Sequence, residues 1–158
     1  MSAGGAAYAG TLDEAALRDW GRSIGARPPL GAALCLYGPL GAGKSTLARA
    51  IGRGGGVHAP MPSPTFNLVY GYELGGGGRL LHFDLYRVRS PDEVASLGWE
   101  EVGTGDALAV IEWPERAGAL LPADRWDVKL AIASGRPDLR DVRVIRVGAP
   151  APLPMPRG

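Results

Sequence analysis

The feature that most constrains the fold is a glycine-rich run over residues 38–46, which reads Gly-Pro-Leu-Gly-Ala-Gly-Lys-Ser-Thr. It matches the pattern G-x-x-x-x-G-K-[ST] of a phosphate-binding loop, or P-loop. The glycines let the backbone turn so that several N–H groups face a phosphate, and the N-terminus of the following helix adds positive potential. The run therefore predicts a site for the triphosphate of a nucleotide.

The flanking sequence favours this interpretation over a chance glycine turn. A P-loop requires a buried strand before it and a helix after it. The apolar run from Ala32 to Tyr37 is bounded by glycine and predicts a buried strand, and Lys44 to Ile51 has the residues and spacing of a helix. The order of strand, loop and helix is thus the required one.

Each position of the loop has an expected part in binding Mg-ATP. Lys44 is expected to reach the β and γ phosphates, and the Ser45 hydroxyl to ligate Mg²⁺. Arginine supplies all but two of the 17 basic residues, so a lysine at position 44 is informative. The rest of the expected phosphate cradle consists of Gly38, Leu40, Gly41, Ala42, Gly43 and Thr46.

Two carboxylates are candidates for the metal and for catalysis. Asp84 follows the apolar run 80–83, and Glu112 follows the apolar run 108–111. Ligands of open α/β sheets bind at the carboxyl ends of the strands, so both acids are expected to face the nucleotide. The sequence leaves open which of them is nearer Mg²⁺ and which orients the attacking water. A solvated acid at a strand end is the alternative for each.

The other segments predict an α/β fold with a mixed sheet. An amphipathic helix is expected from Thr11 to Ile24, with Thr11 as its N-cap in a capping box. Two pairs of strands read as antiparallel neighbours, which excludes a purely parallel sheet. These pairs are 66–72 with 79–85, and 126–133 with 140–147; a further buried strand is expected at 107–111, and short helices at 90–97 and 115–120.

The length of 158 residues suits a single domain. We expect a folded P-loop domain over residues 11–147. Residues 1–10 read as a frayed N-terminal tail. Residues 148–158 contain four prolines and predict a disordered C-terminal tail.

Composition narrows the function classes. A net charge of +1 gives no sign of strong direct binding to nucleic acid. The lone Cys35 has no partner for an internal disulfide, and with two histidines in the chain a zinc site is not expected. The first residues lack the pattern of a signal peptide, and no apolar run is long enough to span a membrane, so the expected location is the cytoplasm.

Four segments in this order resemble the bacterial TsaE (YjeE) family. They are the loop 38–46, Ser-Pro-Thr-Phe at 63–66, His-Phe-Asp-Leu-Tyr-Arg at 82–87 and Ile-Glu-Trp-Pro-Glu at 111–115. The P-loop by itself is generic, but the combination with the two later segments is specific. The resemblance covers about residues 11–147.

The resemblance implies a small P-loop ATPase with a three-layer α/β sandwich. Members of the family are required for threonylcarbamoyladenosine formation in tRNA beside the anticodon, and work with a TsaB–TsaD pair that carries out the transfer. Contact with tRNA is therefore expected through these partners. By motif position, Lys44, Ser45, Asp84 and Glu112 take the nucleotide and metal roles. The resemblance also implies that Thr65 falls in a segment that acts as a switch, and that Trp113 lies beside the nucleotide.

Three alternatives stay open at this point. A small-molecule kinase usually carries an arginine-rich lid, and the region after Arg89 shows no clear one. A GTPase normally needs an N-K-x-D element, which the sequence lacks. A nucleotide-gated regulatory subunit with little turnover of its own is harder to separate from a partner-stimulated ATPase.

Overall fold

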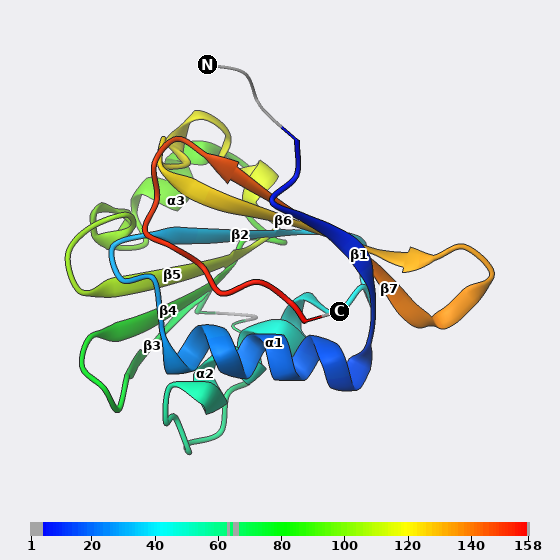
Figure 1. The fold of residues 1–158 in the computed structure, drawn as a ribbon. Coiled ribbons are helices and arrows are strands. Elements are labelled where there is room, and N and C mark those ends of the chain that lie inside the picture. Colours follow the sequence, from blue (N-terminus) through cyan, green and yellow to red (C-terminus); the bar gives the residue numbers. More distant parts are fainter. Residues whose placement is uncertain (1–4, 63, 65–66, 158) are drawn as a thin grey trace.

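The computed structural model describes residues 5–62, 64 and 67–157, and within them the chain forms one sheet covered by helices on both faces (Figure 1). The strands are β1 (Tyr8–Asp13), β2 (Ala33–Tyr37), β3 (Val69–Glu73), β4 (Arg79–Asp84), β5 (Ala107–Glu112), β6 (Arg125–Ala133) and β7 (Arg136–Val147). The helices are α1 (Glu14–Ala26), α2 (Lys44–Gly54) and α3 (Pro91–Ala95), with short 3-10 turns η1 (Trp99–Glu101), η2 (Pro114–Arg116) and η3 (Gly118–Leu120).

The sheet is mixed, as the sequence predicted. Its seven described strands lie in the order β1-β7-β6-β2-β5-β4-β3. The central strand β2 pairs in parallel with β5 and β6, and β4 pairs in parallel with β5. The pairs β3–β4, β6–β7 and β1–β7 are antiparallel. The predicted α/β class and both predicted antiparallel pairs are therefore confirmed.

Alternate residues of β2 explain the three layers. Leu34 and Leu36 face one hydrophobic cluster, and Ala33 and Cys35 face the other, because successive side chains of a strand point to opposite faces. The first cluster is completed by α1 and α2, and the second by α3 and the 3-10 turns. In Figure 1 α1 and α2 lie together across one face of the sheet.

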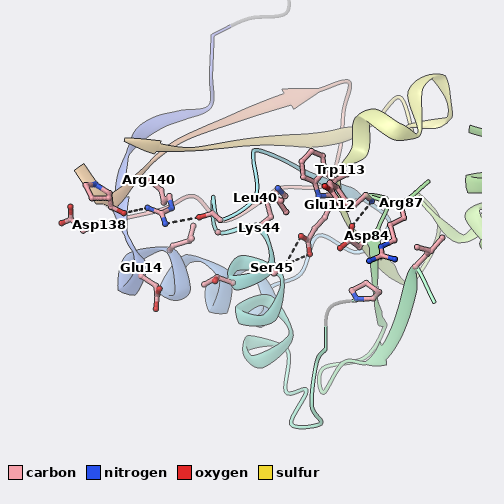
Figure 2. Close-up of a pocket in the computed structure, with 18 residues that line it drawn as sticks. Glu14, Leu40, Lys44, Ser45, Asp84, Arg87, Glu112, Trp113, Asp138 and Arg140 are labelled. Atoms are coloured by element: carbon pink, nitrogen blue, oxygen red, sulfur yellow. Dashed lines mark hydrogen bonds between the residues drawn. The ribbon is translucent and has the colours of Figure 1, made fainter. Parts of the chain in front are cut away.

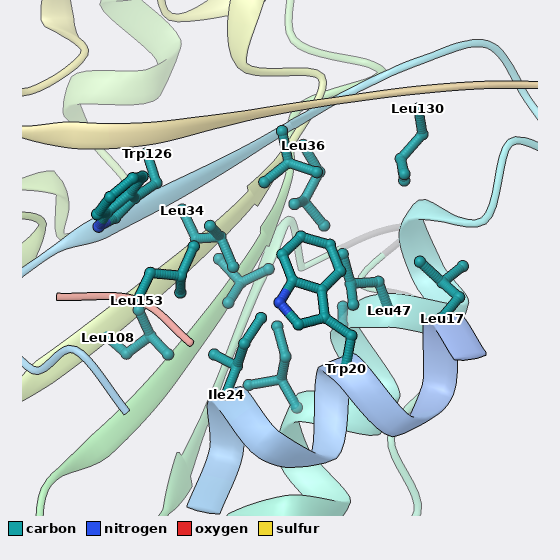
Figure 3. Packing of buried hydrophobic residues seen from close by; sticks show 14 of the residues in the cluster. Leu17, Trp20, Ile24, Leu34, Leu36, Leu47, Leu108, Trp126, Leu130 and Leu153 are labelled. Atoms are coloured by element: carbon teal, nitrogen blue, oxygen red, sulfur yellow. The ribbon is translucent and has the colours of Figure 1, made fainter. Parts of the chain in front are cut away.

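The larger cluster packs around one tryptophan of α1. Figure 3 shows Trp20 among Leu34, Leu36 and Leu47, from three different elements. Trp20 is 2% exposed and the three leucines are fully buried. Removing this much apolar surface from water fixes α1 and α2 on the sheet, and so fixes the start of each helix beside the loop 38–43.

The N-terminal part differs from the prediction in two respects. The expected tail includes the first half of β1, which pairs with β7 from Tyr8↔Val144 to Asp13↔Leu139. Helix α1 begins at Glu14, not at Thr11, and its N-cap is Asp13, whose carboxylate accepts a hydrogen bond from the N–H of Ala16 at 2.8 Å. Aspartate caps a helix as well as threonine does, and Thr11 is held in the strand.

The segment 148–157, here called the C-terminal strap, is also not the disordered tail that its prolines predicted. It runs across the face of the sheet that carries α1 (Figure 1). The indole N–H of Trp126 donates to the Ala151 carbonyl at 2.8 Å, and that of Trp20 donates to the Pro154 carbonyl at 2.7 Å. Leu153 is 6% exposed and belongs to the larger cluster. Proline favours an extended backbone whose carbonyls are free to accept such bonds.

Smaller differences concern the ends of elements. The strand predicted at 66–72 is described from Val69 to Glu73, and Phe66 lies outside the described residues. Strand β7 begins at Arg136, four residues before the prediction, so the β6–β7 hairpin is longer than expected. Within the described chain, no helix combines the length and the apolar character needed to cross a membrane.

Candidate functional site

The loop predicted to bind phosphate connects the end of β2 to the start of α2. Two of its glycines have left-handed backbones, with φ of +81° at Gly41 and +105° at Gly43. Gly43 is the N-cap residue of α2 and no side chain caps the helix. A Cβ atom on Gly43 would also lie 2.9 Å from a Leu17 methyl carbon. The loop therefore needs glycine here, and the helix presents uncapped N–H groups, as an anion site requires.

A cavity of about 660 Å³ opens beside this loop, at the carboxyl ends of the parallel strands. Figure 2 shows Lys44 and Ser45 in its middle, with Asp84, Arg87, Glu112 and Trp113 on one side. The volume lies within the range of small-molecule and cofactor sites. Its position is the one at which open α/β sheets bind ligands.

Lys44 is held inside the loop. It is only 5% exposed, and its Nζ donates to the Gly38 carbonyl and, at 3.0 Å, to the Pro39 carbonyl. The ammonium also lies 4.2 Å from the centroid of the Trp113 ring, in a cation–π contact. Burial lowers the pKa of Lys44, and the charge of Glu112 opposes this effect. The ammonium group of Lys44 is thus a buried cation on a flexible side chain, and it lies beside the cavity.

A buried chain of polar groups joins α2 to the sheet. The Ser45 hydroxyl lies 3.0 Å and 3.2 Å from the two carboxylate oxygens of Glu112. The second oxygen also contacts Nε2 of His82 at 2.6 Å. Glu112 and His82 are 2% and 1% exposed, and Nδ1 of His82 has no hydrogen-bond partner in the described structure. His82 is therefore the group that fixes the orientation of the Glu112 carboxylate from behind.

Asp84 lies next to Glu112, since the two residues are paired across β4 and β5. It is half-buried and accepts a hydrogen bond from the N–H of Tyr86 at 3.0 Å. Burial raises the pKa of Asp84; the Tyr86 hydrogen bond opposes this rise, and the charge of Glu112 adds to it. Two neighbouring carboxylates repel each other, and a cation bound between them would relieve this repulsion.

Trp113 has a left-handed backbone, with φ of +57°. A bulky residue rarely adopts this conformation, and such strain is concentrated at functional sites. The turn directs the indole towards Lys44 and towards the Tyr86 ring, whose centroid is 4.9 Å away. The aromatic ring thus lines the cavity next to the metal candidates rather than the core alone.

The oxygen atoms at this site suit magnesium. Ser45, Asp84 and Glu112 offer one hydroxyl and two carboxylates, which are hard ligands. In the described part of the chain no three His, Cys, Asp or Glu side chains form a metal cluster. Mg²⁺ commonly takes one or two carboxylates together with water and substrate phosphates, so these residues fit it.

The structure brings the predicted site residues together, with two refinements. The predicted residues that line the cavity are Leu40, Gly41, Gly43, Lys44, Ser45, Thr46, Asp84, Glu112 and Trp113. Ala42 is instead buried in the core, and Gly38 acts through the carbonyl that holds Lys44. Thr65 lies outside the described residues.

Six further residues line the cavity that the sequence did not point to. They come from the start of α1, from the segment before β3 and from the β6–β7 hairpin, and they are Glu14, Leu17, Leu68, Pro137, Asp138 and Arg140. No motif marks them. The predicted pair of strands 126–133 and 140–147 was the one feature of the sequence that could have pointed to the hairpin residues, but its second strand was expected to begin only at Arg140.

Comparison with known proteins gives one consistent family. The family model described as "Threonylcarbamoyl adenosine biosynthesis protein TsaE" matches residues 11–140. The tRNA threonylcarbamoyladenosine biosynthesis protein TsaE of Streptomyces coelicolor is 35% identical over 136 residues, which are 84% of this chain and 91% of that protein. The protein of the same name from Haemophilus influenzae is 40% identical over 87 residues, 55% of this chain and 54% of that protein, so the match spans about half of that relative's length.

A solved structure agrees on the fold. YdiB from Bacillus subtilis superposes with a TM-score of 0.69, over 89% of this chain and 88% of that one, at 24% sequence identity.

Proposed function

This chain belongs to the TsaE family of threonylcarbamoyl adenosine biosynthesis proteins, and we propose that it is a magnesium-dependent ATPase that supports the threonylcarbamoyladenosine modification of tRNA. The observation that carries the proposal is the contact of Ser45 with Glu112 beside the P-loop. In P-loop NTPases Mg²⁺ is held by such a pair, a hydroxyl at the start of the helix after the loop and a carboxylate at the end of a neighbouring strand.

Binding of the triphosphate would change the partners of Lys44. The loop carbonyls of Gly38 and Pro39 now accept its hydrogen bonds. The β and γ phosphates carry more charge than a carbonyl, so the ammonium turns to them while the loop N–H groups and the N-terminus of α2 cradle the same oxygens. Lys44 then stabilises the charge that builds on the phosphates during hydrolysis.

Asp84 and Glu112 would bind the metal and orient the attacking water. Ser45 with Glu112 or Asp84 would hold Mg²⁺, which when bound neutralises phosphate charge. One carboxylate faces the metal, and the other accepts a hydrogen bond from the attacking water. His82 keeps Glu112 in a single orientation through the 2.6 Å contact. Trp113 covers the phosphates and excludes water from this side, and Thr65 senses the γ phosphate as a switch residue.

We propose the biological setting by analogy with the family. We place the protein with a TsaB–TsaD complex in the cytoplasm, where it contacts tRNA through these partners. The net charge of +1 agrees with indirect contact, since a protein that binds tRNA on its own face usually carries a basic excess.

Steady-state hydrolysis of Mg-ATP tests the proposal. Turnover would be measured for the protein alone and with TsaB, TsaD and tRNA, in the wild type and in Glu112→Gln. Glu100→Gln is the matched control, because Glu100 is exposed and outside the cavity. We expect stimulation by the partners, and a loss of about 100-fold in Glu112→Gln alone.

Equal rates with and without the partners would contradict the role in tRNA modification and leave a generic P-loop site. Transfer of phosphate to a small molecule, in place of water, would indicate a kinase. Tight nucleotide binding with no turnover in either condition would indicate a nucleotide-gated regulatory subunit.

A further inference from the structure

The part of the cavity beside Asp84 and Glu112, here called the acid end, also contains an arginine that the proposed function has not used. Arg87 lines the cavity, and Figure 2 shows it on the same side of Ser45 as the two acids. Arg87 is exposed, whereas Asp84 is half-buried and Glu112 is buried. A cation therefore lies beside the two carboxylates, at the surface of the same cavity.

A short turn after β4 presents this arginine. The N–H of Val88 donates to the Leu85 carbonyl at 3.0 Å, which closes a four-residue turn with Tyr86 and Arg87 in its middle. Leu85 and Val88 are 0% and 1% exposed and belong to the second hydrophobic cluster, so the core anchors both ends of the turn. The N–H of Leu85 also donates to the Glu112 carbonyl at 3.1 Å, which joins the turn to the end of β5. The backbone of Arg87 is thereby held in one place beside the acids.

The charges of the acid end give this cation a use. The two carboxylates would repel the oxygens of a γ phosphate, so a phosphate at this end needs positive charge beside it. Among the described residues that line the cavity, the cations are Lys44, Arg87 and Arg140. Arg140 lies on the opposite side of Ser45 in Figure 2, where its Nη2 donates to a carbonyl of the P-loop at 3.1 Å. Of these three described cations, Lys44 and Arg87 are therefore the ones at the acid end.

The chemical step at this end rests on the proposed function, in which the γ phosphate of ATP lies beside the acids. The oxygen of the attacking water forms a bond to the γ phosphorus, and the bond from this phosphorus to the β–γ bridging oxygen breaks, with its electron pair left on ADP. One proton of the water passes to a neighbouring carboxylate and then to solvent, so the products are ADP and inorganic phosphate. In the transition state negative charge is spread over the γ-phosphoryl oxygens, and a cation placed against them lowers the barrier.

We infer that Arg87 is a further catalytic residue, whose guanidinium donates hydrogen bonds to the γ-phosphate oxygens from the solvent side of the acid end. A guanidinium presents its N–H donors in a planar fork, which pairs with two phosphate oxygens at once. Lys44 serves both the β and the γ phosphate, but the contact of Arg87 is with the γ phosphate alone and is lost when ADP forms. Arg87 therefore distinguishes a nucleoside triphosphate from a diphosphate and also lowers the barrier to hydrolysis.

Two nucleotides and two variants test this role. Isothermal titration would give the Kd of Mg-ADP and of Mg-AMP-PNP, an ATP analogue that carries a γ phosphate and resists hydrolysis. Single-turnover hydrolysis of Mg-ATP, with the protein in excess, would give the rate of the chemical step. Arg87→Met removes the guanidinium and keeps an unbranched side chain. Arg89→Met is the matched control, because Arg89 lies on the same connection between β4 and α3, is exposed and is outside the cavity.

We expect Arg87→Met to weaken Mg-AMP-PNP about tenfold, to leave Mg-ADP within about twofold and to slow hydrolysis about 100-fold, and Arg89→Met to change none of the three. Equal weakening of both nucleotides would mean that Arg87 only shapes the cavity, and would overturn the inference. Hydrolysis at the wild-type rate would overturn it too, as would a loss confined to the rate stimulated by TsaB and TsaD, which would assign Arg87 to a partner contact. Failure of the wild type to bind either nucleotide would instead refute the proposed function itself.

Discussion

Truncation of one leucine in the C-terminal strap tests whether the strap is part of the folded domain. Leu153 is 6% exposed and packs in the cluster that contains Trp20 and Leu34. Replacement of a buried leucine by alanine costs about 2–5 kcal/mol, and the lower half applies because a terminal segment can relax into the space. We therefore expect Leu153→Ala to lower the free energy of unfolding by about 2–3 kcal/mol.

Urea denaturation followed by tryptophan fluorescence would measure this loss, since Trp20 and Trp126 both donate hydrogen bonds to the strap. The melting temperature should fall by about 5–10 °C, at about 2–4 °C per kcal/mol for a chain of this size. Leu40→Ala is the control, because Leu40 is 68% exposed and its loss should cost less than about 0.5 kcal/mol. A change in Leu153→Ala as small as in this control would refute the packing of the strap.

Three further predictions concern the site and the core. Lys44→Ala should remove ATP turnover yet still fold and melt cooperatively, and normal turnover would contradict the site. His82→Ala should cost about 3–5 kcal/mol of stability in the wild type, because it removes the imidazole partner of the buried Glu112 carboxylate and leaves only the Ser45 hydroxyl. The cost should be smaller in the Glu112→Gln background, and equal costs in the two backgrounds would exclude the coupling. Burial raises the pKa of the Cys35 thiol from 9.0 to about 12, so the folded protein should not react with a thiol reagent at pH 8, and a free reaction would place the thiol at the surface. The free energy of unfolding should also fall as the pH rises from about 9 towards 12, because in this range the thiol ionises readily only in the unfolded chain.

The sequence predicted the parts of the site that depend on short segments. The P-loop is continuous, and its glycines have the left-handed backbones that only glycine adopts readily. Asp84 and Glu112 could be placed because each ends an apolar strand, and the parallel register of β4 and β5 then pairs them. The rule that ligands bind at the carboxyl ends of parallel strands was enough to place Asp84 and Glu112 in one site, although they are far apart in the chain.

The ends of the chain were predicted less well because their structure depends on distant partners. Residues 8–10 have little local preference for a strand, and it is pairing with β7 that makes them one. The strap likewise has a composition typical of disorder, and two tryptophan side chains from α1 and β6 hold it. Tertiary contacts of this kind override local preference.

Arg140 shows the same limit within the site itself. Its bond to Gly41 joins residues 99 positions apart, so no local pattern contains both. The sequence predicted that the last strand begins at Arg140. As the first residue of that strand, directly after the connection, Arg140 had no predicted side-chain orientation. Because β7 begins at Arg136, Arg140 lies within the paired strand opposite Leu12 of β1 and Ile132 of β6. Sheet pairing on both sides thus fixes the backbone of Arg140, so that its guanidinium reaches the Gly41 carbonyl of the P-loop.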